Sequence, residues 1–179
     1  RRLWAVYVGF TALMAVAYFV AGMSIYDAVS HSFTTVSTGG FSPYQASFGH
    51  FESALLEWIC IVGMLLAGGS FTLYWRALRG NVKPLLRSTE FHVYLAFVSA
   101  ITLWAFVTAG NNGGQSTGFR DALFTTASTV TTTGYVATEY GLWSQTAQSL
   151  LLIALPLGAM AGSTAGGIKL LRVMAVSSF

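Results

Sequence analysis

Four long apolar runs constrain the fold of this chain more than any other feature. They cover roughly residues 3–26, 53–75, 92–110 and 144–178, and each is long enough for a helix to cross the hydrocarbon core of a bilayer, which needs roughly 20 residues. Only 8% of the 179 residues are charged, against about 25% in soluble domains. The sequence therefore predicts an all-α integral membrane protein that lies in a lipid bilayer.

Two uncharged segments rich in threonine and glycine separate these runs. One reads TTVSTGGFSP at residues 34–43, and the other reads STVTTTGYVA at residues 128–137. Each is too short and too polar to span a membrane, yet too apolar for an ordinary surface loop. Backbone at membrane depth must be hydrogen-bonded internally, buried in protein or exposed to a water-filled cavity. We therefore expect both segments to be re-entrant, entering and leaving the membrane on the same side.

The two segments are parts of an internal repeat. A shift of 94 positions superimposes identical residues without a gap, among them Asp27 on Asp121, Thr38 on Thr132 and Gly40 on Gly134. The same shift places AGGS at residues 67–70 on AGST at residues 161–164. The expected unit is a helix, a pore loop and a second helix. We predict one such repeat at residues 1–75, a cytoplasmic linker at residues 76–91 and a second repeat at residues 92–179.

Basic residues indicate which side of the membrane each segment faces. They lie before the first run, between the second and third runs, and near the end of the fourth: Arg1, Arg2, Arg76, Arg79, Lys83, Arg87, Lys169 and Arg172. Because cytoplasmic segments carry the excess of lysine and arginine, we expect both ends of the chain and the linker in the cytoplasm. Both loops then enter from outside, where Arg120 is the exception to the pattern. An external connection at residues 110–118, including Asn112, precedes the second loop.

A chemistry for the loops follows from their hydroxyl groups and glycines. Residues 27–36 and 121–130 can each form about three helical turns with an aspartate at the start. The negative C-terminal end of such a half-helix favours a cation. Gly40 and Gly134 then permit turns whose carbonyl oxygens face a common axis and replace the water around an alkali ion. The loops contain no carboxylates, which disfavours a divalent ion.

The predicted filter therefore consists of two short runs of loop residues. They are Val36, Ser37, Thr38, Gly39, Gly40, Phe41, Val130, Thr131, Thr132, Thr133, Gly134 and Tyr135. The alternative is a structural re-entrant turn packed in protein, in a membrane module without its own ion pathway that assembles with a partner.

Three motifs in this order, HSFTTVSTGGFS, TTTGY and GSTAGGIKLLR, resemble those of the Trk/Ktr/HKT superfamily of potassium and sodium transport proteins, particularly the bacterial TrkH-type membrane subunits. The resemblance covers essentially the whole chain. It implies a potassium-channel-like fold of four repeats around one pore, of which this chain matches the second and third. It also implies Gly40 and Gly134 as filter glycines, K⁺ as the transported ion, and no covalent cofactor.

The resemblance further implies the surroundings of the chain. These are a multi-pass position in the bacterial inner membrane, the remaining pore repeats of the same protein, a homodimeric membrane part and a cytosolic nucleotide-binding regulatory subunit. We accordingly expect the chain, which begins at Arg1, to be a piece of a longer protein. A sodium-conducting or sodium/potassium cotransporting member of the superfamily stays open, as does the choice between channel and symporter.

The last apolar run contains a concentration of glycines in GAMAGSTAGGIK. Glycine weakens a helix by about 1 kcal/mol relative to alanine, so we expect residues 161–167 to unwind and break the last transmembrane helix. Close packing of small residues between helices is the alternative. A nucleotide-binding P-loop is excluded because Ile168 separates the glycines from the lysine. In TrkH-type proteins the matching segment is a gate, and the resemblance places that role on Gly162, Ser163, Thr164, Ala165, Gly166, Gly167 and Lys169.

Other functions find less support in the residues. The scattered basic residues form no patch for nucleic acid. An intramembrane enzyme with Ser163 as nucleophile would need a base at membrane depth, and none of the three histidines is an evident partner, so we expect no enzyme. We expect His31 to be packed and hydrogen-bonded, and Glu57 to lie on a cation-attracting rim or in solvent.

Overall fold

The computed structural model describes residues 2–109 and 118–177, so that Arg1 and most of the predicted external connection, with Asn112, lie outside the described residues. The described part is helical and contains no strand, which confirms the all-α prediction. Its α-helices are α1 Arg2–Val20, α2 Ile25–Val36, α3 Ala54–Ala67, α4 Phe71–Leu78, α5 Lys83–Leu86, α6 Thr89–Ala109, α7 Phe119–Val130, α8 Gln145–Ala154 and α9 Leu170–Ser177. Short 3₁₀ turns, Ser47–Phe51 and Tyr140–Leu142, lie in the connections after α2 and α7.

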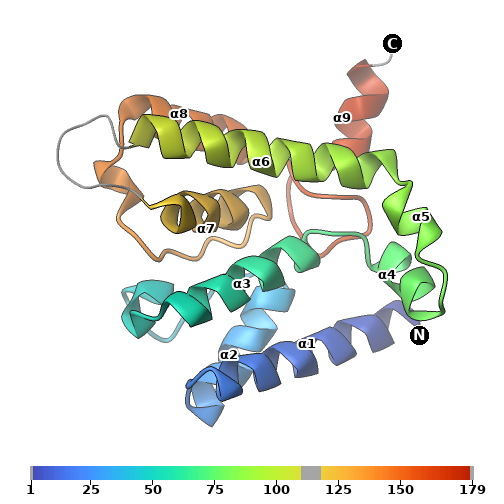
Figure 1. Cartoon of the computed structure of the whole chain (residues 1–179), viewed down its shortest axis with the longest axis horizontal. Coiled ribbons are helices and arrows are strands. Elements are labelled where there is room, and N and C mark those ends of the chain that lie inside the picture. The colour runs from blue at the N-terminus through green and yellow to red at the C-terminus, as the bar shows by residue number, and fades with distance from the viewer. Residues whose placement is uncertain (1, 110–117, 178–179) are drawn as a thin grey trace.

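Two long helices each carry a half-length helix at their side. Within the described ranges, α1 and α6 are the single helices long and apolar enough to cross a membrane. Helix α2 packs against α1, and α7 packs against α6 (Figure 1). The half-length helices α2 and α7 have 12 residues each, and their bounds obey the shift of 94 positions found in the sequence. These two helices therefore begin and end at equivalent positions of the internal repeat.

The apolar run at residues 53–75 does not form one straight helix. α3 ends at Ala67, α4 begins at Phe71, and the two helices are bent by 98°. The prediction of an uninterrupted second span is therefore wrong. The bend contains two glycines, which weaken a helix, and it packs closely on α6, since a Cβ added at Gly68 would lie 2.6 Å from the Tyr94 hydroxyl.

The last apolar run is interrupted, as predicted, but over a longer stretch. The segment between α8 and α9 covers residues 155–169 rather than 161–167, and we call it the break loop. Its two ends are joined by backbone hydrogen bonds of 2.8 Å, from the Gly158 N–H to Ile168 O and from the Ile168 N–H to Pro156 O. Figure 1 shows the segment as an open loop between α8 and the outward-pointing α9.

Two apolar cores correspond to the two halves of the chain. Tyr18 and Met64 belong to the first core, and Tyr94 and Met160 belong to the second. Three residues of the second half also enter the first core: Phe124, Ala127 and Tyr135. The two halves therefore interlock. The predicted boundaries after residues 75 and 91 fall within α4 and α6, and the division into repeats stays a prediction.

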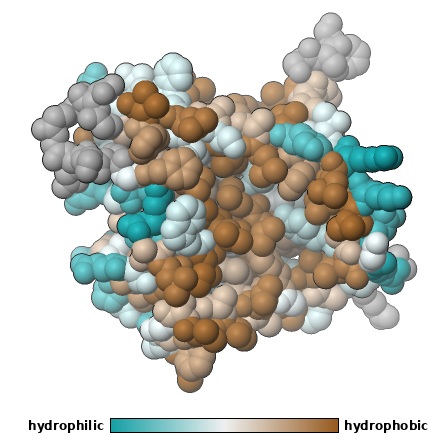
Figure 2. Space-filling view, viewed as in Figure 1, coloured by the Kyte–Doolittle hydropathy of each residue, from teal (hydrophilic) through white to brown (hydrophobic). Residues whose placement is uncertain are grey.

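The outside of the fold is largely apolar. In Figure 2 hydrophobic residues cover the broad middle of the visible face, whereas hydrophilic residues gather toward its left and right sides. Large apolar side chains are exposed on both long helices, among them Trp4, Leu13, Val20, Leu103, Trp104 and Val107. Soluble proteins rarely expose apolar surface of this extent, whereas a surface in contact with lipid is expected to be apolar.

Candidate functional site

Each half-length helix begins with an aspartate that stabilises its first turn. The Ser24 hydroxyl accepts a hydrogen bond from the Asp27 N–H at 3.1 Å and donates one to the Asp27 carboxylate at 2.7 Å. The Tyr44 hydroxyl also donates to that carboxylate, at 3.1 Å. In α7, the Asp121 carboxylate accepts a hydrogen bond from the Gly118 N–H at 3.0 Å. Both aspartates lie at the positive end of a helix dipole, as predicted.

Each half-length helix ends in the same backbone turn. Left-handed φ angles occur at two pairs of equivalent residues: 53° at Thr38 and 55° at Thr132, and 63° at Gly40 and 85° at Gly134. In each turn two successive N–H groups donate to one carbonyl oxygen of the preceding helix, at 2.8 and 3.3 Å in the first and at 2.9 and 3.3 Å in the second. Threonine seldom adopts a positive φ, so its occurrence at the same place in both turns indicates one shared geometry. We call residues 36–41 the first turn and residues 130–135 the second turn.

The two turns present carbonyl oxygens without hydrogen-bond donors. In the part of the chain that the structure describes, no N–H or O–H group donates to the carbonyl oxygens of residues 38–40 or 132–134. Two neighbouring carbonyl oxygens do accept hydrogen bonds: Ser37 O from Thr38 Oγ1 at 2.6 Å, and Tyr135 O from Ser128 Oγ at 2.8 Å. Carbonyl oxygens at membrane depth need water, protein or an ion as a partner, and a monovalent cation suits this uncharged set.

The two turns are in direct backbone contact. A Cβ added at Gly40 would lie 1.9 Å from Thr133 O and 3.1 Å from the Gly134 carbonyl carbon. A Cβ added at Gly134 would meet no atom within 4 Å. The structure therefore brings the predicted filter residues of both loops together, and it makes Gly40 the position of closest approach.

The last residues of the two turns differ in burial. Phe41 is 78% exposed, whereas Tyr135, its counterpart in the repeat, is 3% exposed. The Tyr135 hydroxyl lies 2.5 Å from Thr34 Oγ1 and 3.2 Å from Thr35 Oγ1, both on α2. A phenol keeps its proton at neutral pH, so the Tyr135 hydroxyl can donate a hydrogen bond. A side chain of the second turn is thus anchored in the first half of the chain.

The break loop lies against the C-terminal ends of both half-length helices. Thr164 Oγ1 donates a hydrogen bond to Val36 O at 2.7 Å, at the end of α2. The Gly166 N–H donates to Thr132 Oγ1 at 2.6 Å, just after α7. The residues predicted as a gate are therefore bonded directly to residues predicted as a filter.

Lys169 holds the break loop in its folded-back shape. Its Nζ donates to Ala165 O and, at 3.3 Å, to Ser163 Oγ. The Ser163 hydroxyl in turn donates to Met160 O at 2.7 Å. These three hydrogen bonds link groups within the break loop and stabilise its folded-back shape.

The break loop is also bonded to the bend between α3 and α4. The Met160 N–H donates to Gly68 O at 3.0 Å, and the Phe71 N–H donates to Gly162 O at 3.1 Å. Sequence reasoning did not predict this contact. The available signal was the alignment of AGGS with AGST, which marks two equivalent breaks in helices but does not say that they touch.

Glu90 is a further anchor of the break loop that sequence reasoning overlooked. It lies in the first turn of α6, and its carboxylate accepts a hydrogen bond from the Ala161 N–H at 2.5 Å. A carboxylate at the start of a helix is ordinarily explained by the helix dipole, so the sequence carried no signal for this contact.

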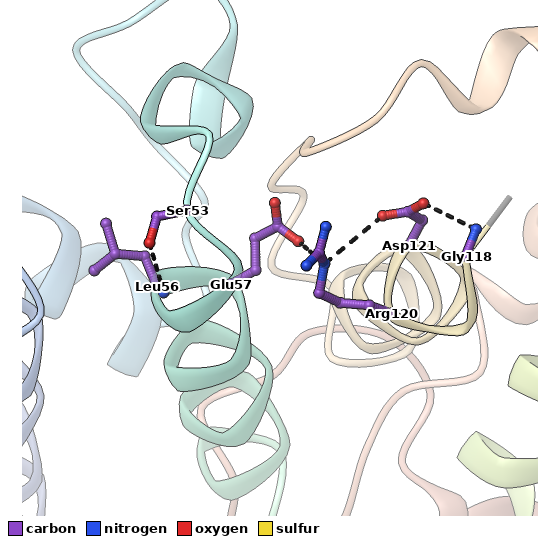
Figure 3. Close-up of polar contacts among 6 residues, drawn as sticks. All are labelled: Ser53, Leu56, Glu57, Gly118, Arg120 and Asp121. Atoms are coloured by element: carbon purple, nitrogen blue, oxygen red, sulfur yellow. Dashed lines mark hydrogen bonds and ion pairs between the residues drawn. The ribbon is translucent and has the colours of Figure 1, made fainter.

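An ion pair joins the two halves of the chain at the N-terminal ends of α3 and α7. Arg120 Nε lies 2.5 Å from Glu57 Oε2 and 4.0 Å from Asp121 Oδ1. Figure 3 shows the Arg120 side chain between the two carboxylates, one from each helix. Glu57 is only 9% exposed, so the prediction of a rim or solvated position is wrong. The neighbouring Arg120 guanidinium offsets the cost of removing the Glu57 carboxylate from water.

His31 lies inside the protein behind the first turn. It is fully buried, its Nδ1 lies 2.8 Å from Asp27 O, and its Nε2 lies 3.1 Å from Ser42 Oγ. The prediction of a packed, hydrogen-bonded histidine is confirmed.

These features define a class of protein: a helical integral membrane protein in which two half-length helices end in adjoining turns of the same geometry. The model of a family described as a cation transport protein, TrkH, matches residues 1–179. The chain belongs to this family, as the resemblance of its motifs implies.

Several relatives support the same assignment. The Trk system potassium uptake protein TrkH of Halomonas elongata is 34% identical over 98% of this chain and 37% of that protein. The protein of the same name from Escherichia coli is 32% identical over 97% of this chain and 37% of that protein. The crystal structure of the potassium transporter TrkH from Vibrio parahaemolyticus matches with a TM-score of 0.90 and 33% identity, over 98% of this chain and 39% of that chain. The chain thus spans somewhat more than a third of the length of these relatives.

Proposed function

We propose that this chain supplies the second and third of four pore repeats of a bacterial potassium uptake protein, with the repeats at residues 1–75 and 92–179 and a cytoplasmic linker between them. One observation carries the proposal: two turns of equal backbone geometry lie in contact and hold carbonyl oxygens that accept no hydrogen bond from the described residues. Relatives over nearly the whole chain are named potassium uptake proteins, which favours K⁺ over other cations.

The turns would act on the ion through dipoles rather than through full charges. Each turn begins where a half-length helix ends, and the C-terminal end of a helix carries about half a negative charge. The carbonyl oxygens of residues 38–40 and 132–134 add further dipoles, and together they replace part of the hydration shell of the ion. Two turns make half of a ring, which the first and fourth repeats would complete.

A groove of about 670 Å³ beside the second turn fits this incomplete ring. Its walls combine apolar residues with hydroxyl and amide side chains, among them Thr125, Ser128, Thr129, Tyr140, Gln145 and Gln148. Polar groups of this kind are seldom presented to lipid. We propose that another repeat of the same protein covers the groove. A homodimeric membrane part and a cytosolic nucleotide-binding regulatory subunit are the further partners that we propose from the family.

The break loop would be the gate below the filter. It is bonded to both turns through Thr164 and Gly166, so that its displacement must break hydrogen bonds at the ends of both half-length helices. Lys169 stabilises the folded-back loop from its own cytoplasmic edge. Gating would then be the exchange between this bonded loop and a displaced conformation.

The proposed function is tested by ion uptake through the complete protein that carries these 179 residues. Expressed in bacteria that lack potassium uptake systems, it is expected to restore growth at limiting potassium and to transport K⁺ in preference to Na⁺ in reconstituted vesicles, because a ring of carbonyl dipoles favours the ion whose hydration shell it replaces. Equal or preferred Na⁺ transport would support the sodium-conducting alternative. Normal abundance in the membrane without any cation flux would support a structural module.

The orientation in the membrane gives an independent prediction. Arg79 lies in the proposed cytoplasmic linker and Glu139 follows the second turn, and both are exposed in the structure. In a Cys60→Ser background, a cysteine at position 139 is expected to react with a membrane-impermeant thiol reagent on intact cells, and one at position 79 only after permeabilisation, because basic residues mark the cytoplasmic side. The reverse pattern of labelling would invert the proposed topology.

A further inference from the structure

The side chain of Tyr135 crosses from the second turn into the first half of the chain. Its hydroxyl lies 2.5 Å from Thr34 Oγ1, 3.2 Å from Thr35 Oγ1 and 3.2 Å from His31 O, all on α2. Its ring packs beside His31 and Phe48, with centroid distances of 6.0 and 5.2 Å. Tyr135 therefore joins a loop of one repeat to the half-length helix of the other.

The hydroxyl groups around Tyr135 form a chain in which each proton can be used once. Thr34 Oγ1 also lies 3.1 Å from Ser30 O, to which its hydroxyl can donate. The Tyr135 hydroxyl donates its one proton either to His31 O or to Thr34 Oγ1, and it also lies within hydrogen-bond distance of Thr35 Oγ1. Thr35 Oγ1 in turn lies 2.9 Å from the Tyr18 hydroxyl. Hydrogen bonds arranged in series strengthen one another, and this series runs from α1 through α2 to the second turn.

Among the described residues, the first turn has no anchor of this kind. Phe41, which the repeat aligns with Tyr135, lacks a hydroxyl and is exposed. At Tyr135 the backbone is held as well, because its carbonyl accepts from Ser128 Oγ at 2.8 Å. The Tyr135 side chain therefore joins the second turn directly to α2.

We propose that the Tyr135 hydroxyl is a positioning group for ion discrimination. It fixes the distance between the second turn and α2, and with it the separation of the carbonyl oxygens of the two turns. The inference rests on the proposed filter function and assigns a residue that sets its selectivity. The number and placement of carbonyl oxygens around the ion set the preference for K⁺ over the smaller Na⁺, and binding geometry of this kind tolerates a displacement of about 0.5 Å.

Tyr135→Phe in the complete protein tests the proposal, because the substitution removes the hydroxyl and keeps the buried ring. The ratio of K⁺ to Na⁺ flux is expected to fall about 2- to 10-fold, the range that corresponds to one lost hydrogen bond, at unchanged abundance in the membrane. Tyr26→Phe is the matched control: Tyr26 lies on α2, is 69% exposed, and its substitution is expected to leave the ratio unchanged. A wild-type ratio for Tyr135→Phe would overturn the proposal.

A second variant separates the anchor from general loosening of the fold. If Tyr135 acts through Thr34, then Thr34→Val lowers the ratio as well, and the double variant is no worse than Tyr135→Phe alone. Effects that multiply in the double variant would contradict the assignment. If Gly40→Ala lowers the flux ratio while Tyr135→Phe does not, the proposed role of Tyr135 is wrong and the filter assignment stands. If both variants keep the wild-type ratio, the filter assignment is wrong with it.

Discussion

Gly40→Ala is expected to abolish most potassium-selective uptake by the complete protein that carries this chain. The new Cβ would lie 1.9 Å from Thr133 O, so the two turns must separate. Residue 40 also has a φ of 63°, which residues with a Cβ resist. Overpacking of this kind costs about 1–3 kcal/mol, which corresponds to roughly a 5- to 150-fold change in an equilibrium. Uptake at limiting potassium and the ratio of K⁺ to Na⁺ flux measure the effect.

Gly134→Ala is the matching substitution in the second turn, where the added Cβ would meet no atom within 4 Å. Only its φ of 85° is unfavourable for alanine, at about 1–2 kcal/mol, so its effect should be the smaller of the two. Gly9→Ala on α1, where a Cβ also meets nothing within 4 Å, is expected to behave as wild type. Wild-type flux ratios for both turn variants, at equal abundance in the membrane, would defeat the filter assignment.

The parts of the site that sequence alone predicts are local in the chain. The half-length helices begin at Ile25 and Phe119, two residues before the predicted starts, because Ser24 and Gly118 precede the aspartates as N-caps. Their last residues, Val36 and Val130, agree with the prediction. Capping residues and turn glycines act on their own neighbours, and the repeat supplied the same pattern twice.

The contacts that join these parts depend on neighbours distant in the sequence. Phe41 and Tyr135 occupy equivalent positions in the repeat, yet Phe41 is exposed and Tyr135 is buried, with its hydroxyl bonded to α2. Glu57 meets Arg120 across the two halves, which no spacing along the chain indicates. The bend after Ala67 was missed for a different reason, since apolar residues lie on both sides of Gly68, Gly69 and Ser70 and hydropathy does not register a change of direction.

The largest gain in flux is expected when Gly162, Gly166 and Gly167 of the break loop are all replaced by alanine. Gly162 and Gly167 have φ angles of 79° and 71°, where alanine costs about 1–2 kcal/mol each. A Cβ at Gly166 would lie 3.1 Å from Thr132 Oγ1, the acceptor of the Gly166 N–H. In a helix, by contrast, each alanine is favoured by about 1 kcal/mol. The strain in the loop and the preference of alanine for a helix both destabilise the hydrogen-bonded conformation of the break loop.

A shift of about 2 kcal/mol already changes the ratio of two conformers roughly 30-fold, so a gate poised within a few kcal/mol would open. We therefore expect higher flux and a weaker response to the regulatory subunit in reconstituted vesicles, with the K⁺ preference kept because the turns retain their residues. Shortening the break loop should raise flux in the same way by removing the obstruction. Gly141→Ala, where a Cβ meets no atom within 4 Å, is the matched control and should change neither property. If the loop variants reach the membrane and conduct with unchanged rate and regulation, the break loop is a packing motif and the gate lies elsewhere.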